Sequence, residues 1–181
     1  HLVGELGYRT PARLVSLLDT VHTGGFAQAV DLGCGTGLVG ALLAGRCERL
    51  IGVDLSPEMI HQARAKGVYS DLFVGDIEAV LPTLGACSLL IAADVVIYLG
   101  ALDGLMAAAA AVLSPGGLLA LTTEHLPGEG WRLLPSGRYA HSLSAVAAAG
   151  EEHGLTVVAS AIEPIRQERG QWLDGGLVVL R

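Results

Sequence analysis

The sequence is short of charge, of aromatic rings and of lysine. Of its 181 residues, 16% are charged and 4% are aromatic, whereas 51% are hydrophobic, and Lys66 is the single lysine. Disordered chains combine low hydrophobicity with high net charge, so this composition excludes disorder for most of the chain. The length suits one domain over residues 1–181, with enough apolar side chains for a sizeable core.

Long apolar runs are lacking as well. The longest stretch without a charged residue has 20 residues, between Asp103 and Glu124. The sequence SPGG at residues 114–117 interrupts it and would break a spanning helix. Charged side chains within the first 13 residues leave no apolar core for a secretory signal. We therefore expect no association with a membrane.

Cysteine is scarce, and its spacing carries no pattern. Cys34, Cys47 and Cys87 are odd in number and form no CxxC pair, so neither a disulfide framework nor a metal site is expected. A reducing, cytoplasmic location fits this usage. The chain has 11 basic and 18 acidic residues, and thus a net charge of −7. An acidic protein repels phosphate groups, so we expect no nucleic-acid partner.

What the sequence does contain is an alternation of short apolar runs with helical stretches. This alternation is typical of an α/β fold, in which a mostly parallel sheet carries helices on both faces. Seven strands are predicted, at residues 27–32, 50–53, 72–74, 89–93, 117–123, 155–162 and 176–180. The main helices are predicted at residues 10–21, 37–44, 56–66, 102–113 and 142–153.

A glycine-rich turn follows the first predicted strand. Residues 30–37 read VDLGCGTG, so Gly33, Gly35 and Gly37 stand between a buried strand and a helix. Glycine permits a tight turn and a close approach of a ligand to the main chain, and the next helix presents free N–H groups. In an open parallel sheet this turn lies at the carboxyl edge, where ligands bind.

Two ligand classes use such a turn. The spacing Gly35-x-Gly37-x-x-Gly40 matches the dinucleotide fingerprint. The overlapping pattern that begins at Asp31 places a carboxylate at the end of the strand. A carboxylate suits a ligand with an ammonium group and would repel a pyrophosphate. The residues favour a ligand with an ammonium group and leave a dinucleotide open as the alternative.

Three further acids, Asp54, Asp76 and Asp94, follow the next three predicted strands. A carboxylate at the position of Asp54 can accept hydrogen bonds from a ribose diol. The alternative for Asp54 is a helix cap, for which Ser56 is better placed. Asp76 can pair with an adenine amino group while Ile77 packs on the ring; the alternative is a plain loop aspartate. The row of acids predicts one ligand site at this edge.

These motifs resemble those of the class I S-adenosylmethionine-dependent methyltransferases. The resemblance extends over residues 25–124 and is carried by residues 30–37 (VDLGCGTG), 52–59 (GVDLSPEM), 75–77 (GDI) and 113–117 (LSPGG). A narrower likeness, to predicted methyltransferases that often carry N-terminal tetratricopeptide repeats, is carried by residues 92–95 (AADV), 98–100 (YLG) and 136–142 (SGRYAHS). This sequence contains no such repeats.

The resemblance implies a Rossmann-like seven-stranded fold, S-adenosyl-L-methionine as cofactor and S-adenosyl-L-homocysteine as product. It also implies cofactor contacts at matching positions. By this resemblance, the methionine part of the cofactor would contact Asp31, Gly33, Gly35 and Asp94. The ribose would contact Asp54, with Leu55 and Met59 nearby, and the adenine would contact Asp76 and Ile77. The segment 1–25 would cover the pocket, with Tyr8 and Arg9 near the cofactor carboxylate.

Recognition side chains gather in residues 125–141, which read as an acceptor-side loop because of their glycines and prolines. The candidates for acceptor contact or proton transfer are Tyr98, His125, Arg138 and His141. Arg138 suits an anionic acceptor, or else pairs with Glu124 or Glu129. A sulfonium methyl group is already electrophilic, so holding the acceptor close to it should supply most of the catalysis. A general base is needed only if the acceptor is a hydroxyl or a protonated amine.

Methyl transfer to a small molecule by in-line displacement is the leading hypothesis, and two other functions fit parts of the sequence. A nicotinamide-dependent oxidoreductase would use the GxGxxG spacing, but no Tyr-x-x-x-Lys constellation accompanies it. A non-catalytic module that binds a cofactor or a partner on the same fold stays open, because the acceptor chemistry is not visible in the sequence.

Overall fold

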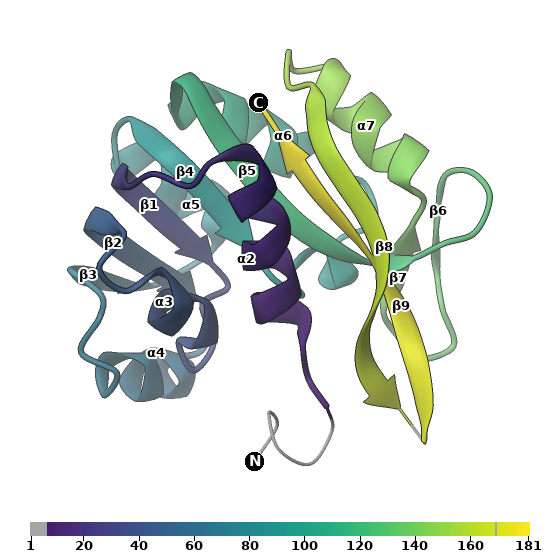
Figure 1. Ribbon diagram of the computed structural model, residues 1–181, viewed down its shortest axis with the longest axis horizontal. Helices are drawn as coiled ribbons and strands as arrows, with labels where there is room; N and C mark the ends of the chain where they lie inside the picture. The colour runs from purple at the N-terminus through teal and green to yellow at the C-terminus, as the bar shows by residue number, and fades with distance from the viewer. Residues whose placement is uncertain (1–6, 169) are drawn as a thin grey trace.

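A nine-stranded sheet organises residues 7–168 and 170–181, which the computed structural model describes (Figure 1). The strands are β1 (Phe26–Leu32), β2 (Cys47–Asp54), β3 (Asp71–Val74), β4 (Cys87–Ala92), β5 (Leu113–His125), β6 (Trp131–Leu133), β7 (Tyr139–His141), β8 (Val157–Glu168) and β9 (Gln171–Leu180). Their order is β3-β2-β1-β4-β5-β7-β6, and β9 pairs with both β5 and β8. The strands from β3 to β5 are parallel, whereas β9 runs antiparallel to its neighbours.

The helices are α2 (Thr10–Val21), α3 (Leu38–Leu43), α4 (Pro57–Arg64), α5 (Ile77–Val80), α6 (Asp103–Val112) and α7 (Leu143–Glu151), with 3-10 turns η1 (Leu81–Thr83) and η2 (Val96–Tyr98). Local chemistry starts some of them. Ser56 caps α4 by accepting a bond from the N–H of Met59, and Pro57 opens its first turn. None of the helices in the described ranges is long and apolar enough to cross a membrane.

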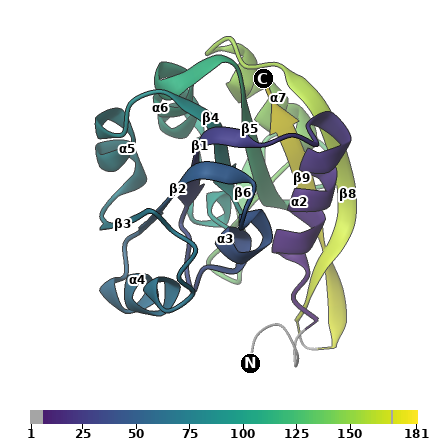
Figure 2. The ribbon, with the colours of Figure 1, turned by 60° about the vertical axis from the view of Figure 1, so that its left-hand side comes forward.

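Both faces of the sheet are covered, which explains the continuous apolar strands. Along β1, Val30 and Leu32 belong to one buried cluster with α6, whereas Ala29 belongs to another with α2 and α3. Successive side chains of a strand point to opposite faces, so a strand covered on both faces must be apolar throughout. Figures 1 and 2 show α2 lying across the sheet and beside β8.

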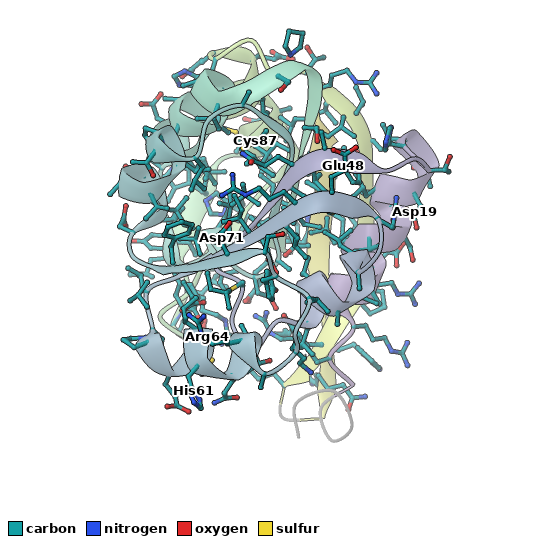
Figure 3. All side chains as sticks on the ribbon, turned by 90° about the vertical axis from the view of Figure 1, so that its left-hand side faces the viewer. Asp19, Glu48, His61, Arg64, Asp71 and Cys87 are labelled. Carbon is teal, nitrogen blue, oxygen red and sulfur yellow. The ribbon has the colours of Figure 1, made fainter. Side chains whose placement is uncertain are left out.

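The far edge of the sheet is β3, which faces the viewer in Figure 3. Asp71 begins this strand and forms an ion pair with Arg49 of β2, with 2.7 Å between Nη2 and Oδ2. The pair is exposed and lies at the amino ends of the strands. It therefore stands apart from the carboxyl edge, where the loops meet.

The structure contains the seven predicted strands and adds β6 and β7. Residues 125–141, predicted as a loop, fold in part into this hairpin, and β7 pairs in parallel with the end of β5. Strands of three residues are too short to show an alternating pattern, and neighbouring glycines and prolines concealed them. The strands β8 and β9 also run longer than predicted, because their outer ends carry polar side chains.

A β-bulge shapes the long β8–β9 hairpin. Pro164 pairs with Asp174 and Arg166 pairs with Leu173, so Ile165 is the extra residue in β8. The Ile165 side chain is fully buried in the cluster beneath α2. A bulge breaks the alternation of a strand and can redirect the next side chain. Arg166, the next residue, lines a cavity at the carboxyl edge.

Candidate functional site

Two adjoining cavities lie at the carboxyl edge of the parallel strands. The first, of about 250 Å³, is bordered by the ends of β2 and β3 through Asp54, Leu55, Asp76 and Ile77. The second, of about 410 Å³, is bordered by the glycine-rich turn, and its charged and aromatic side chains include Tyr8, Arg138 and Arg166. Gly33, Asp94 and Tyr98 line both. The two cavities therefore meet at these three residues and form one bent site.

The glycine-rich turn forms the floor where the cavities meet. Gly33 has a φ of 62°, in the left-handed region that disfavours L side chains. A Cβ atom at Gly33 would lie 2.6 Å from Cγ2 of Val95, so a side chain would also collide with the opposite loop. The N–H of Cys34 donates to the carbonyl of Val53 over 3.0 Å, which ties the turn to β2. The turn thus leaves bare backbone facing the site.

Asp54 organises the first cavity from the end of β2. Its Oδ2 accepts the N–H of Gly35 over 2.9 Å, and its Oδ1 accepts the N–H of Ser56 over 2.8 Å. One carboxylate therefore joins the glycine-rich turn to the start of α4. The lone pairs that remain on its oxygens are available to a ligand in the cavity.

Asp76 combines two roles at the end of β3. Its Oδ1 caps α5 by accepting the N–H groups of Glu78 and Ala79 over 2.9 and 3.3 Å. The residue also lines the first cavity together with Ile77. A cap that uses one oxygen leaves the other free, so the helix-capping role and the predicted ligand role are compatible.

Asp94 lies where the cavities meet, in a strained backbone conformation. Within the described ranges it is the one non-glycine residue with a positive φ, of 57°. Such strain costs about 1–3 kcal/mol and clusters at functional sites. Two contacts hold Asp94 in place: its N–H donates to Oγ1 of Thr122 over 2.8 Å, and its Oδ1 accepts from Arg166 over 3.2 Å.

A chain of ion pairs continues from Asp94 across the second cavity. Arg166 also donates to Oε2 of Glu124 over 2.7 Å, and Arg138 donates to the same oxygen over 3.0 Å. Arg138 makes a further pair with Glu168. The Arg138 charge is thus neutralised by two carboxylates: the expected ion pair with Glu124 is present, and Glu168 takes the place of Glu129.

Two tyrosines frame the second cavity. Burial and the neighbouring carboxylate of Asp94 raise the pKa of Tyr8 far above its usual value, so the hydroxyl stays protonated. Tyr98, at the end of η2, is 71% exposed and reaches both cavities. The cavity therefore offers one buried hydroxyl and one accessible ring at its mouth.

Comparison with known proteins identifies the architecture. Residues 29–117 match the family model of the methyltransferase domain. The chain is 40% identical to human methyltransferase-like protein 27 over 131 residues, which is 67% of this chain and 51% of that protein. It is 36% identical to the bovine 18S rRNA (guanine-N(7))-methyltransferase over 62 residues, which is 32% of this chain and 22% of that protein. The chain thus spans about half the length of the human relative.

One solved structure matches nearly the whole chain. It is the 1,6-didemethyltoxoflavin-N1-methyltransferase of Burkholderia thailandensis, with bound 1,6-didemethyltoxoflavin and S-adenosylhomocysteine. The match has a TM-score of 0.75 at 16% identity and covers 95% of this chain and 77% of that chain. The fold is the class I methyltransferase fold. The resemblance stated from the sequence is therefore confirmed at the level of this fold.

Most of the residues singled out in the sequence lie around the site of this class I methyltransferase fold, and four lie outside both cavities. Arg9 is exposed and its guanidinium stacks over Trp172, 4.7 Å from the ring centroid. His125 ends β5 with no contact to either cavity. Met59, expected near the ribose, lines the second cavity instead. Of the segment 1–25, residues 1–6 lie outside the described residues, and Tyr8 and Pro11 border the second cavity.

His141 is buried in the sheet of the methyltransferase fold rather than facing the site. Its Nδ1 lies 3.0 Å from Oγ1 of Thr123, and its Nε2 lies 2.8 Å from the carbonyl oxygen of Gly100. Burial lowers its pKa. Both ring nitrogens are occupied by these contacts, so the geometry gives the predicted proton transfer by His141 no support. Ser142, the next residue, is the one that caps α7.

Asp31 is the fourth predicted residue that lies outside both cavities. It is buried beneath the glycine-rich turn and is 1% exposed. It accepts a 2.6 Å bond from the hydroxyl of Tyr69 and a bond from the N–H of Gly40. Asp31 therefore lines neither cavity, and this geometry gives the predicted direct contact with a ligand no support. Burial raises the pKa of Asp31 to about 7, against the smaller lowering effect of these two hydrogen bonds.

This raised pKa predicts a pH dependence of stability. The folded chain keeps a proton on Asp31 that the unfolded chain releases above about pH 4, so the contribution of Asp31 to stability is fully present below that pH. It is lost as the pH rises through about 7. Urea denaturation across this window should show stability falling with rising pH more steeply in the natural chain than in Asp31→Asn. Equal slopes for the two proteins would contradict the prediction.

Two residues of the site had not been singled out in the sequence. Arg166 lies four residues beyond the predicted end of its strand, and Pro164, which marks a bulge or an edge strand, was the available signal. Tyr69 stands between α4 and β3 in a stretch without periodicity. Nothing in the local sequence could connect it to Asp31, 38 residues away.

Proposed function

We propose that this chain binds S-adenosyl-L-methionine and transfers its methyl group to a small-molecule acceptor. The observation that carries the proposal is the junction of two cavities at Gly33, Asp94 and Tyr98. The methyl group of the cofactor and the acceptor atom must lie next to each other for the transfer. Two cavities that join at one point allow this arrangement. The proposal is further supported by the match of residues 29–117 to the methyltransferase domain family.

The residues present fit this cofactor. Asp54 and Asp76 offer acceptors for a ribose diol and an adenine amino group, and Ile77 offers an apolar surface for the base. Gly35 lines the second cavity, and a Cβ at this position would meet nothing within 4 Å, so the turn leaves space for the methionine part. The carboxylate of Asp94, held in place by Arg166, suits the ammonium group.

The bound cofactor supplies an electrophilic methyl group, and the chain supplies position. The turn at Gly33 and the carboxylates of Asp54 and Asp76 orient the nucleoside, while Tyr8 and Tyr98 border the space for the acceptor. Holding two reactants in line can lower a barrier by roughly 7–11 kcal/mol. Tyr8 stays protonated, so its hydroxyl keeps a proton with which to donate a hydrogen bond. Tyr98 and Arg138, which line the second cavity, stay candidates for acceptor contact.

The charges around the site favour a small molecule over RNA. Asp54, Asp76, Glu78 and Asp94 line the first cavity, and the arginines of the second cavity are already paired with carboxylates. A phosphate backbone would meet repulsion there. The bovine relative acts on rRNA by its name, so RNA remains the competing acceptor.

Binding and transfer test the proposal separately. Calorimetric titration with S-adenosylhomocysteine should show binding, whereas NADH should not bind; the reverse result would favour the oxidoreductase. Methyl-labelled cofactor is then added to a cell extract, which is separated into small molecules, RNA and protein. We expect label among the small molecules. Binding without any labelled product would favour the non-catalytic module, and label in RNA would overturn the acceptor class.

Two narrower expectations accompany the proposal as predictions. One is the likeness to methyltransferases that carry tetratricopeptide repeats, which rests on residues 92–100 and 136–142 alone. The other is a cytoplasmic location, which rests on the unpaired cysteines. Fluorescent tagging of the full-length protein in its own cells would test the location.

Replacing Arg166 by lysine should weaken S-adenosylhomocysteine binding about tenfold, or ~1.4 kcal/mol. Lysine keeps the charge but lacks the planar fork that joins Asp94 to Glu124, so Asp94 loses its support. The matched control is Arg13→Lys, which alters a more exposed ion pair with Glu163 of the same strand β8. Calorimetry measures both. Equal affinity of Arg166→Lys and the natural chain would remove Arg166 from the site.

A further inference from the structure

Three glycines form a slot that holds the ring of Tyr69. A Cβ atom at Gly40 would lie 2.3 Å from both Cζ and Oη of this ring, and Cβ atoms at Gly37 and Gly52 would lie 3.1 and 3.0 Å from its edge. Gly37 belongs to the glycine-rich turn, Gly40 to α3 and Gly52 to β2. Gly40 is the last glycine of the GxGxxG spacing, and in this structure it makes room for Tyr69 rather than for a dinucleotide.

The main chain beside Tyr69 is anchored as firmly as its ring. Ser70 donates its N–H to the carbonyl of Leu50 over 2.7 Å, and its Oγ accepts the N–H of Leu50 over 3.2 Å. Both bonds join the segment before β3 to β2. The position of the Tyr69 hydroxyl is thus set by the sheet and by the glycine slot, rather than by a mobile loop.

The hydroxyl of Tyr69 donates to the buried carboxylate of Asp31 over 2.6 Å, and it also accepts from the N–H of Gly40. Asp31 lies on β1, two residues before Gly33 and directly below the turn. Burial and the carboxylate raise the pKa of Tyr69 far above its usual value, so Tyr69 stays a donor. Because Asp31 has a side-chain donor and the Gly40 N–H as partners, loss of the hydroxyl would leave a buried charge half satisfied.

We propose that Tyr69 is a positioning residue of the cofactor site, which holds the Asp31 carboxylate in place beneath the glycine-rich turn and favours its ionised form. The inference rests on the proposed function and goes beyond it, because Tyr69 lines neither cavity. A negative charge buried close to the floor of the site attracts the sulfonium of S-adenosylmethionine across a low-dielectric layer. It attracts the neutral thioether of S-adenosylhomocysteine much less.

Other groups also act on Asp31. Asp54 of β2 opposes its ionisation, the thiol of Cys34 in the turn stays neutral, and α3 presents the N–H of Gly40. Lys66, after α4, packs its side chain against Gly37 on the outer side of the turn. The Tyr69 bond favours the ionised form of Asp31, so its loss should raise the pKa of Asp31 above the value of about 7 in the natural chain.

The test compares the two ligands in Tyr69→Phe, which keeps the ring in its slot and removes the hydroxyl. At about pH 7, S-adenosylmethionine should bind about tenfold more weakly than to the natural chain, and S-adenosylhomocysteine about threefold or less. At about pH 9 a larger fraction of Asp31 is ionised in both proteins, so the difference between ligands should shrink. Calorimetry at both pH values measures this, and comparison with the natural chain cancels the titration of the ligands themselves.

Two further variants keep the outcome clear. Asp31→Asn should show the same selective loss without its pH dependence, and Tyr69→Phe should add little to it. Tyr139→Phe, a tyrosine outside both cavities, should change neither affinity. Equal weakening of both ligands by Tyr69→Phe, or no weakening, overturns the inference and leaves the proposed function standing. Failure of the natural chain to bind either ligand overturns the proposed function, and this inference with it.

Discussion

Replacing Asp54 by alanine is expected to weaken S-adenosylhomocysteine binding by about 2–3 kcal/mol, roughly 30- to 150-fold. The variant loses the acceptor for a ribose diol in the first cavity. It also leaves the N–H groups of Gly35 and Ser56 without the partners they have at 2.9 and 2.8 Å. The effect is large because one carboxylate serves the ligand, the turn and the start of α4.

The matched control for this variant is Asp71→Ala. Asp71 is an aspartate on the neighbouring strand β3, and it lies in an exposed ion pair at the opposite end of the sheet. Its loss should change stability by less than about 1 kcal/mol and affinity not at all. Calorimetric titration of both variants decides the matter. An unchanged dissociation constant for Asp54→Ala would refute the assignment of Asp54 to the cofactor.

Replacing Ile165 by alanine is expected to lower the free energy of unfolding by about 2–5 kcal/mol. Ile165 is fully buried at the bulge of β8, and a Cβ atom at Gly175 would lie 2.6 Å from its Cγ2, so the space around it is closely filled. Truncation removes apolar contacts and leaves a cavity below α2. Urea denaturation measures the change.

Ile162→Ala serves as the control on the same strand, since Ile162 is 49% exposed. Its loss should cost within about 0.5 kcal/mol. Ile165→Ala should also weaken S-adenosylhomocysteine binding if the bulge sets the direction of Arg166, whereas Ile162→Ala should not. Equal stability of the two variants would show that the bulge is not a packed feature.

The central part of the fold was predictable because its signals are local. The continuous apolar run of β4 predicts a strand covered on both faces, short apolar runs predict β1 and β2, and Ser56 with Pro57 predicts the start of α4. The hairpin of β6 and β7 was not predictable in this way. Its strands have three residues each, and their pairing with β5 depends on a contact across the sheet.

The same division holds within the site. Gly33, Asp54 and Asp76 were found because chemistry at the ends of parallel strands converges on one edge whatever the remaining structure does. Arg166 was not found, because it lies beyond the predicted end of its strand and its contact with Asp94, 72 residues away, appears only in the folded chain. His141 shows the reverse error: its spacing beside Arg138 suggested recognition, yet the fold buries it with both nitrogens bonded.

The sequence by itself determined the strand–turn–helix that exposes bare backbone and the acids that follow the strands, because these follow from the order of residues along the chain. Only the tertiary structure decided which charges meet. Asp31 with Tyr69, and Asp94 with Arg166, are 38 and 72 residues apart. Such pairs are set by the register of the sheet and by the packing of helices on it. The sequence alone therefore does not predict whether a carboxylate faces a ligand or a buried partner; the tertiary structure does.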